Sequence, residues 1–278
     1  MRLSPALTPA IAVTLAAFAP SVEAHPDIAE KEAFIEQALQ ESPADPTLHL
    51  QRALIQRQRA RWDEAAASYL RAAALGADRD QVGVALAQVF LDAGWPKTAE
   101  MQVQQVLQRR PENARALITR AHVRRALGKP QGAAADFERG VGRLVHPEPG
   151  LVQQGMNAQL AADRPEVALQ IADEAMQKIG IVVSVQLPAI EIELELGRLE
   201  AALARIDALL LQAPRHELWL AQRGEILEGA GRVAEARATY EHILSLIEER
   251  PPRRRSEKIA ALERRLRAKL MQAEASEE

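Results

Sequence analysis

The sequence predicts an all-α protein made of repeated pairs of helices. Of its 278 residues, 47% are hydrophobic but only 3% are aromatic, and Ala, Leu, Glu, Arg and Gln, all strong helix formers, dominate. Gly94 and Pro96 recur 34 residues later as Gly128 and Pro130. A fixed period of this length is typical of repeat proteins, whose units bury their apolar faces against their neighbours.

The N-terminal segment, residues 1–24, has the pattern of a secretory signal peptide. Arg2 precedes an apolar run over residues 10–19, and the small residues Val22 and Ala24 stand just before His25. This order of charged, apolar and small residues is typical of exported proteins. We expect cleavage between Ala24 and His25 and a periplasmic or secreted mature chain. The alternative is that the apolar run forms an ordinary buried helix.

The mature chain is expected to be soluble and not membrane-spanning. No later segment approaches the roughly 20 apolar residues that a spanning helix needs. The sequence contains no Cys, so disulfides cannot stabilise it and stability must come from packing. The formal net charge of −3 does not indicate a nucleic-acid partner.

The period predicts six repeats over residues 46–250. They are numbered one to six, and their first residues are Pro46, Asp80, Ala114, Pro149, Val183 and Glu217. Position 20 is then alanine throughout, at Ala65, Ala99, Ala133, Ala168, Ala202 and Ala236, which lets two antiparallel helices approach closely. The β-branched stretch 181–187 is interpreted as a turn entering a helix, and Pro188 leaves the start of that helix open.

The segments on either side of the repeats are predicted to be capping helices, because terminal repeats need covers. Residues 25–45 form the N-terminal one, with Phe34 and Ile35 facing repeat one. Residues 251–278 combine a basic connector with a C-terminal helix that has an apolar stripe on one side. The connector is either a solvated segment or a basic anchor.

The repeats resemble those of the tetratricopeptide repeat (TPR) family, which has small residues at positions 8 and 20 and a large one at position 24. Repeat two fits through Ala87 and Ala99, and repeat three fits through Ala121 and Phe137. The resemblance covers residues 46–250 and suggests an exported, bacterial-type TPR protein. It implies a right-handed superhelical solenoid of about six helix-turn-helix repeats with capping helices at both ends.

No arrangement of catalytic residues is present in the sequence. Zinc-protease motifs, cysteine clusters, glycine-rich phosphate loops and nucleophile elbows are all absent. No two histidines have the spacing of a metal-binding pair on one helix. We therefore expect a protein that is not an enzyme and needs no cofactor.

The resemblance implies that positions 2, 5, 9, 12 and 13 of the first helices line a ligand groove. The peptide-binding residues would be Leu50, Leu54, Arg57, Gln88, Arg115, Ile118, His122, Arg125, Gln153, Asn157, Glu191, Glu195, Glu225 and Glu228. This groove is basic toward its N-terminal half and acidic toward its C-terminal half. Gln88, Gln153 and Asn157 are expected to hold the backbone of an extended segment. Leu50, Leu54 and Ala85 replace the family's carboxylate clamp, so chaperone-tail binding is not expected.

These features favour a non-enzymatic, exported scaffold that binds an extended peptide or protein partner of unknown identity. One alternative is a copper-binding accessory protein that uses His25 as a metal ligand, because a free amine and an imidazole in one residue are able to chelate copper. An envelope enzyme of unrecognised type is the third hypothesis.

Overall fold

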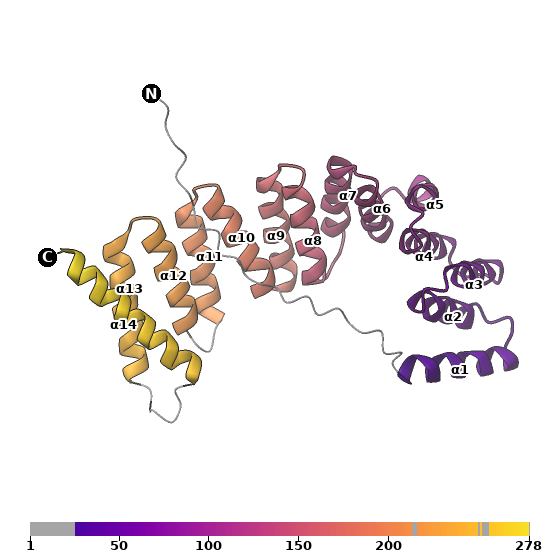
Figure 1. The fold of residues 1–278 in the computed structure, drawn as a ribbon. Coiled ribbons are helices and arrows are strands. Elements are labelled where there is room, and N and C mark those ends of the chain that lie inside the picture. The colour runs from indigo at the N-terminus through magenta and orange to yellow at the C-terminus, as the bar shows by residue number, and fades with distance from the viewer. Residues whose placement is uncertain (1–25, 213–215, 250, 252–255, 278) are drawn as a thin grey trace. The chain divides into compact units, whose positions relative to one another are not determined.

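The computed structural model describes residues 26–212, 216–249, 251 and 256–277. Every regular element within these ranges is a helix, and there are fourteen (Figure 1). Consecutive helices pack in pairs, so the predicted all-α class is confirmed. The predicted signal peptide, His25 and most of the basic connector lie outside the described residues.

The chain divides into two compact units, residues 1–77 and 78–278, which are called the N-terminal and C-terminal units. The N-terminal unit contains α1 (Pro26–Glu41), α2 (Pro46–Gln58) and α3 (Trp62–Ala74). The C-terminal unit contains α4 (Arg79–Asp92), α5 (Pro96–Arg109), α6 (Ala114–Ala126), α7 (Pro130–Gly142), α8 (Pro149–Leu160), α9 (Pro165–Ile179), α10 (Val183–Glu195), α11 (Leu199–Gln212), α12 (Glu217–Gly229), α13 (Val233–Glu248) and α14 (Glu257–Glu277). None of the described helices is both long and apolar enough to cross a membrane.

Helices α2, α4, α6, α8, α10 and α12 are the first helices of repeats one to six. Side chains and prolines set where the helices begin: Asn113 Oδ1 accepts a hydrogen bond from the Ala116 amide at 3.0 Å, and Pro130 occupies the first turn of α7. Gly94 and the other position-15 glycines end first helices with positive φ. Ala60 and Asp163 stand at this position in repeats one and four, and they take φ of 56° and 58°. The turn therefore forms in all six repeats, whether or not glycine is present.

The core of the N-terminal unit lies between α1 and α2. Ile35 and Leu39 of α1 pack with Ile55 of α2, and Ile35 is buried as predicted. Phe34 was predicted to face repeat one as well, but its side chain is 69% exposed. Phe34 does not join this core, because neighbouring residues on a helix lie about 100° apart. Instead it lines an open pocket between α1 and α2 together with Leu54.

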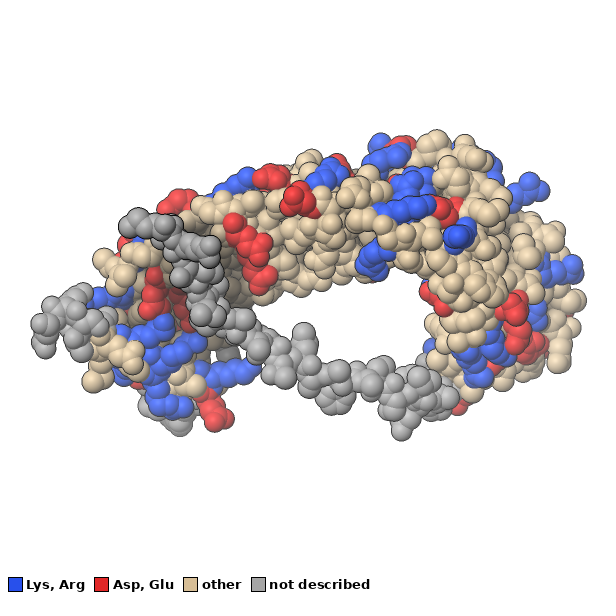
Figure 2. Space-filling view, turned by 45° about the horizontal axis from the view of Figure 1, so that its top comes forward, with Lys and Arg blue, Asp and Glu red and all other residues tan. Residues whose placement is uncertain are grey.

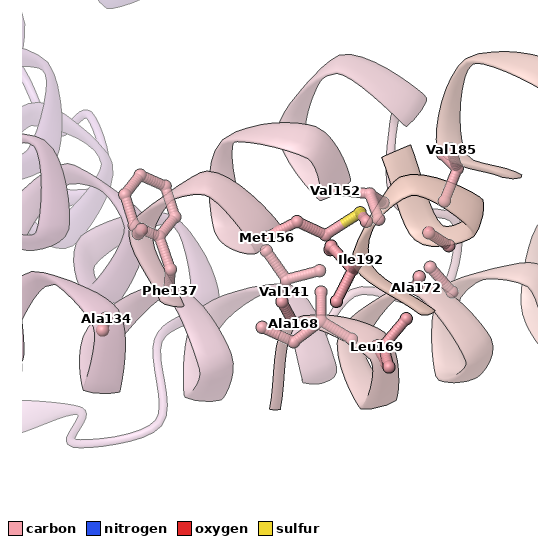
Figure 3. Close-up of a cluster of buried hydrophobic side chains, with 14 of the residues drawn as sticks. Ala134, Phe137, Val141, Val152, Met156, Ala168, Leu169, Ala172, Val185 and Ile192 are labelled. Carbon is pink, nitrogen blue, oxygen red and sulfur yellow. The ribbon is translucent and has the colours of Figure 1, made fainter. Parts of the chain in front are cut away.

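The core of the C-terminal unit runs from one repeat into the next. Figure 3 shows Phe137 of α7, Met156 of α8, Ala168 of α9 and Ile192 of α10 in one cluster. Phe137 and Met156 are completely buried. Contacts of this kind give a repeat the burial that its own two helices cannot supply.

Helix α10 shows how the β-branched stretch and Pro188 are accommodated. The helix begins at Val183, so only residues 181–182 of the stretch precede it. Residues 183–187, also interpreted as a turn, are helical, and Pro188 lies inside the helix. Proline has no N–H to bond to the carbonyl four residues earlier, which is that of Ser184. Gln153 of α8 donates its side-chain N–H to that carbonyl. A side chain from the preceding repeat thus replaces the missing helical hydrogen bond.

Helix α14 covers the last repeat. Ile259, Leu262 and Leu266 are buried and pack with Tyr240 and Ile243 of α13. The apolar stripe read from the sequence is thus the buried side of the helix. Its basic side chains remain available to other neighbours.

Candidate functional site

The side chains predicted to meet a ligand lie on the first helices of the C-terminal unit, and this surface is called the first-helix face. It consists of two rows of residues, at positions nine and twelve of repeats two to six, and of Arg115 and Glu195 on the same set of helices. Row nine is Gln88, His122, Asn157, Glu191 and Glu225, and row twelve is Leu91, Arg125, Leu160, Leu194 and Glu228. Two of the neighbouring first helices touch along it, since Gln88 of α4 donates to Thr119 of α6 at 3.4 Å. Figure 2 shows acidic and basic side chains over one face of the molecule, in some places side by side and in others apart.

Helix α6 carries the basic part of this face. Arg115 and Arg125 are exposed, and neither has a hydrogen-bond or ion-pair partner among the described residues. Arg120 and Arg124 on the same helix differ, since both donate to the buried Asp136 at 2.7 Å. Two arginines of α6 therefore stabilise the fold, and two others remain available to a ligand.

His122 lies beside Arg125 and is half-buried. Its ring meets Phe137 edge to face, with centroids 5.0 Å apart. Burial of the ring, and secondarily the charge of Arg125, lowers the pKa of His122 below its ordinary 6.5. The imidazole is therefore neutral near pH 7 and can offer one donor and one acceptor. Ile118, also predicted to face the ligand, is half-buried and packs against the Phe137 cluster.

The lowered pKa of His122 predicts an acid-dependent loss of stability. The unfolded chain binds this proton more readily than the folded chain, so stability that is present above pH 6.5 is lost as the pH falls below that value. Thermal unfolding of the parent and of His122→Gln, each measured at about pH 7 and about pH 5, should show a smaller acid-induced decrease in Tm for the variant. Equal decreases in the two proteins would contradict the assignment.

The middle of the first-helix face is formed by α8. Asn157 is exposed and has no hydrogen-bond partner in the part of the chain that the structure describes. Leu160 beside it and Leu194 on α10 are each 38% exposed. Gln153, also predicted to hold a ligand backbone, is bonded to the Ser184 carbonyl. Asn157 is thus the amide on α8 that can still bond a ligand.

Helix α10 carries the acidic part. Glu191 and Glu195 are exposed and lack ion-pair partners within the described ranges. Glu193 between them points the other way, is buried, and accepts from Arg205 at 3.1 Å. As on α6, one charged side chain of the helix forms an ion pair within the protein, whereas its neighbours are exposed on the first-helix face.

The corresponding glutamates of repeat six are already paired. Glu225 contacts Arg265 of α14 at 3.0 Å, and Glu228 contacts Lys269 and accepts from the Tyr240 hydroxyl at 2.9 Å. The Lys269 hydrogen bond is the main reason why the pKa of Glu228 is lowered. The prediction of an open acidic surface at Glu225 and Glu228 therefore needs correction. Their basic partners on α14 stand one helical turn apart, which is the signal that sequence reasoning missed.

The N-terminal unit has a separate pocket of about 590 Å³ between α1 and α2. Its lining residues are Glu30, Lys31, Phe34, Ile35, Gln51, Leu54, Ile55 and Gln58. Leu54 was predicted to face a ligand and is 47% exposed here. Leu50 and Arg57 are half-buried and do not line the pocket.

No group of three or more metal-ligating side chains occurs among the residues that the structure describes. His25, the hypothetical copper ligand, lies outside those residues. Copper binding by His25 therefore stays an untested alternative.

Comparison with known proteins supports the repeat assignment. A family model described as tetratricopeptide repeat matches residues 84–144 and 188–252. No curated protein matches the sequence.

Several solved structures are similar to this chain. The C-terminal part of a TPR repeat-containing protein from Cytophaga hutchinsonii is 12% identical with a TM-score of 0.56, over 85% of this chain and 94% of that one. PilF from Pseudomonas aeruginosa is 15% identical with a TM-score of 0.50, over 82% and 98%. A tetratricopeptide repeat protein from Parabacteroides merdae is 16% identical with a TM-score of 0.45, over 86% and 92%. At these identities the likeness concerns the fold alone.

Proposed function

Since the chain is a tetratricopeptide repeat protein, we propose that it is an exported, non-enzymatic scaffold that binds an extended peptide segment of a partner along the first-helix face. Proteins of this family bind other proteins, and α-solenoids of this kind present extended surfaces for that purpose. The proposal of export rests on the signal-peptide pattern of residues 1–24.

The contrast between the two sets of helices supports the proposed surface. Four charges that precede second helices form ion pairs, in which a cation before one second helix pairs with a glutamate of the second helix before it. These pairs are Lys129–Glu100 at 3.0 Å, Arg164–Glu138 at 3.0 Å, Arg198–Glu166 at 3.1 Å, and Arg232–Glu200.

The exposed charged side chains of the first-helix face on α6 and α10 do not form such ion pairs. The observation that carries the proposal is that Arg115 and Arg125 at one end, and Glu191 and Glu195 at the other, lack ion-pair partners throughout the described ranges. Opposite charges held apart on one surface give a binding face both steering and orientation.

Reversing the basic end tests this proposal. Arg115→Glu with Arg125→Glu should weaken capture of partner proteins from an envelope extract by roughly tenfold, because attraction becomes repulsion. The difference should shrink as salt is raised, since exposed charges are screened. Quantitative pull-down at low and high ionic strength measures both effects.

The matched control is Arg71→Glu with Lys97→Glu, because both residues are exposed on second helices. Arg265 on α14 is unsuitable, since it pairs with Glu225. If the control variant loses the partner as strongly as the first-helix variant, binding does not occur on the first-helix face.

Intact-mass measurement of the protein recovered from the envelope tests export, with His25 expected as the first residue.

A further inference from the structure

At repeat six, the glutamates of rows nine and twelve bind basic side chains of α14. Arg265 and Lys269 lie one turn apart on α14 and reach Glu225 of row nine and Glu228 of row twelve. Lys269 also lies over the Tyr240 ring, 5.7 Å from its centroid. At repeat six, the first-helix face is therefore covered by basic side chains of the same chain.

Repeat five has a similar acidic pair without the cover. Glu191 and Glu195 are four residues apart on α10, so they lie on one side of the helix, and both are exposed. The described residues offer them no cation. The exposed Leu194 stands between them. This is a place where a ligand can supply the basic side chain that α14 supplies to repeat six.

The basic end of the face lies two first helices away, on α6. α8 packs against α10, and α6 and α8 both pack against α7. Since packed helices are about 10 Å apart, Arg125 on α6 and Glu191 on α10 are separated by roughly 20 Å or somewhat more. An extended chain advances about 3.3 Å per residue and covers that distance in about six residues. A helical ligand, at 1.5 Å per residue, would need about thirteen residues and would leave no free backbone amides for Asn157 to bond.

We propose that α6, α8 and α10 together bind an extended segment in which an acidic and a basic side chain stand about six residues apart. Arg125 holds the acidic side chain, and Glu191 with Glu195 holds the basic one. Asn157 bonds the backbone between them, and an apolar side chain lies on Leu160 and Leu194. The segment ends at α10 because α14 already covers the next glutamates. This inference rests on the proposed function and adds the charge pattern and the spacing of the ligand.

The test uses short, capped, fluorescein-labelled peptides of Ser and Gly with one Leu midway between one Asp and one Lys. The two charges are placed about three, six or ten positions apart, and binding to the full mature chain is followed by fluorescence anisotropy at low ionic strength. The peptide with a spacing of about six should bind about tenfold more tightly than the other two.

A change of specificity separates this proposal from a folding defect. In Arg115→Glu with Arg125→Glu, both ends of the face are acidic, so the preference should switch to a peptide with two Lys at the same spacing. Lys97→Glu on α5, away from the face, should keep the preference of the parent protein.

Equal binding of the three spacings, or no switch in the double variant, would overturn the proposed pattern. If the envelope partner still depends on Arg115 and Arg125 in that case, the scaffold function stands and only the spacing is wrong. If the partner is also indifferent to these arginines, both proposals fail.

Discussion

Replacing Asp136 with Ala is expected to lower the free energy of unfolding by about 3–5 kcal/mol, the loss that follows when one partner of a buried ion pair is removed. Asp136 is 1% exposed. Its carboxylate accepts three hydrogen bonds of 2.7 Å from arginines of α6: Oδ1 accepts from Arg120, and Oδ2 accepts from both Arg120 and Arg124. Without the carboxylate, two guanidinium groups between α6 and α7 would have no countercharge.

Glu112 provides a matched comparison, since it also pairs with two arginines, Arg139 and Arg143. Its side chain is 48% exposed, so water replaces the lost contacts and Glu112→Ala should have a much smaller effect. Urea unfolding of both variants, followed by circular dichroism, measures the two losses. Similar losses in the two variants would show that burial does not decide the strength of these ion pairs.

Replacing Phe137 with Ala should have an effect of similar size, about 3–5 kcal/mol. The ring is completely buried and belongs to the cluster in Figure 3, where it lies toward one side. It fills the space between repeats three and four, and it also supports the His122 ring. The variant combines the loss of buried apolar surface with a cavity that rigid neighbouring helices cannot fill.

Phe34→Ala is the control for this prediction, because the same side chain is removed from a position that is 69% exposed. Its effect on the free energy of unfolding should stay below about 1 kcal/mol. Calorimetric or urea unfolding of the two variants distinguishes them. A loss at Phe34 as large as that at Phe137 would mean that α1 depends on this ring for its packing.

The positions of the repeats could be predicted because their signals are local. Alanine at position 20, a turn at position 15 and proline in the first turn of the second helix act through neighbours a few residues away. The predicted first residues Pro46, Ala114, Pro149, Val183 and Glu217 are also the first residues of helices, and α4 begins one residue before Asp80.

The candidate site could be predicted only in part. The frame placed Arg115, Arg125, Asn157, Glu191 and Glu195 at positions where the structure leaves them exposed. It could not show that Gln153 bonds to Ser184, because that contact spans 31 residues of chain and depends on Pro188. The repeat numbering assigned Ile118 to a groove position, like the exposed residues, yet its side chain packs against the core.

The sequence by itself thus determined which residues form helices, where the repeats begin and which residues share a face, because these follow from periodicity and local backbone preference. Only the tertiary structure decided which charges on that face are free. Lys269 reaches Glu228 across 41 residues of sequence, whereas Glu191 in the same frame has no such partner in the described part of the chain. An ion pair depends on the distance between two side chains in space, and that distance is set by how neighbouring helices pack, which the repeat pattern does not contain.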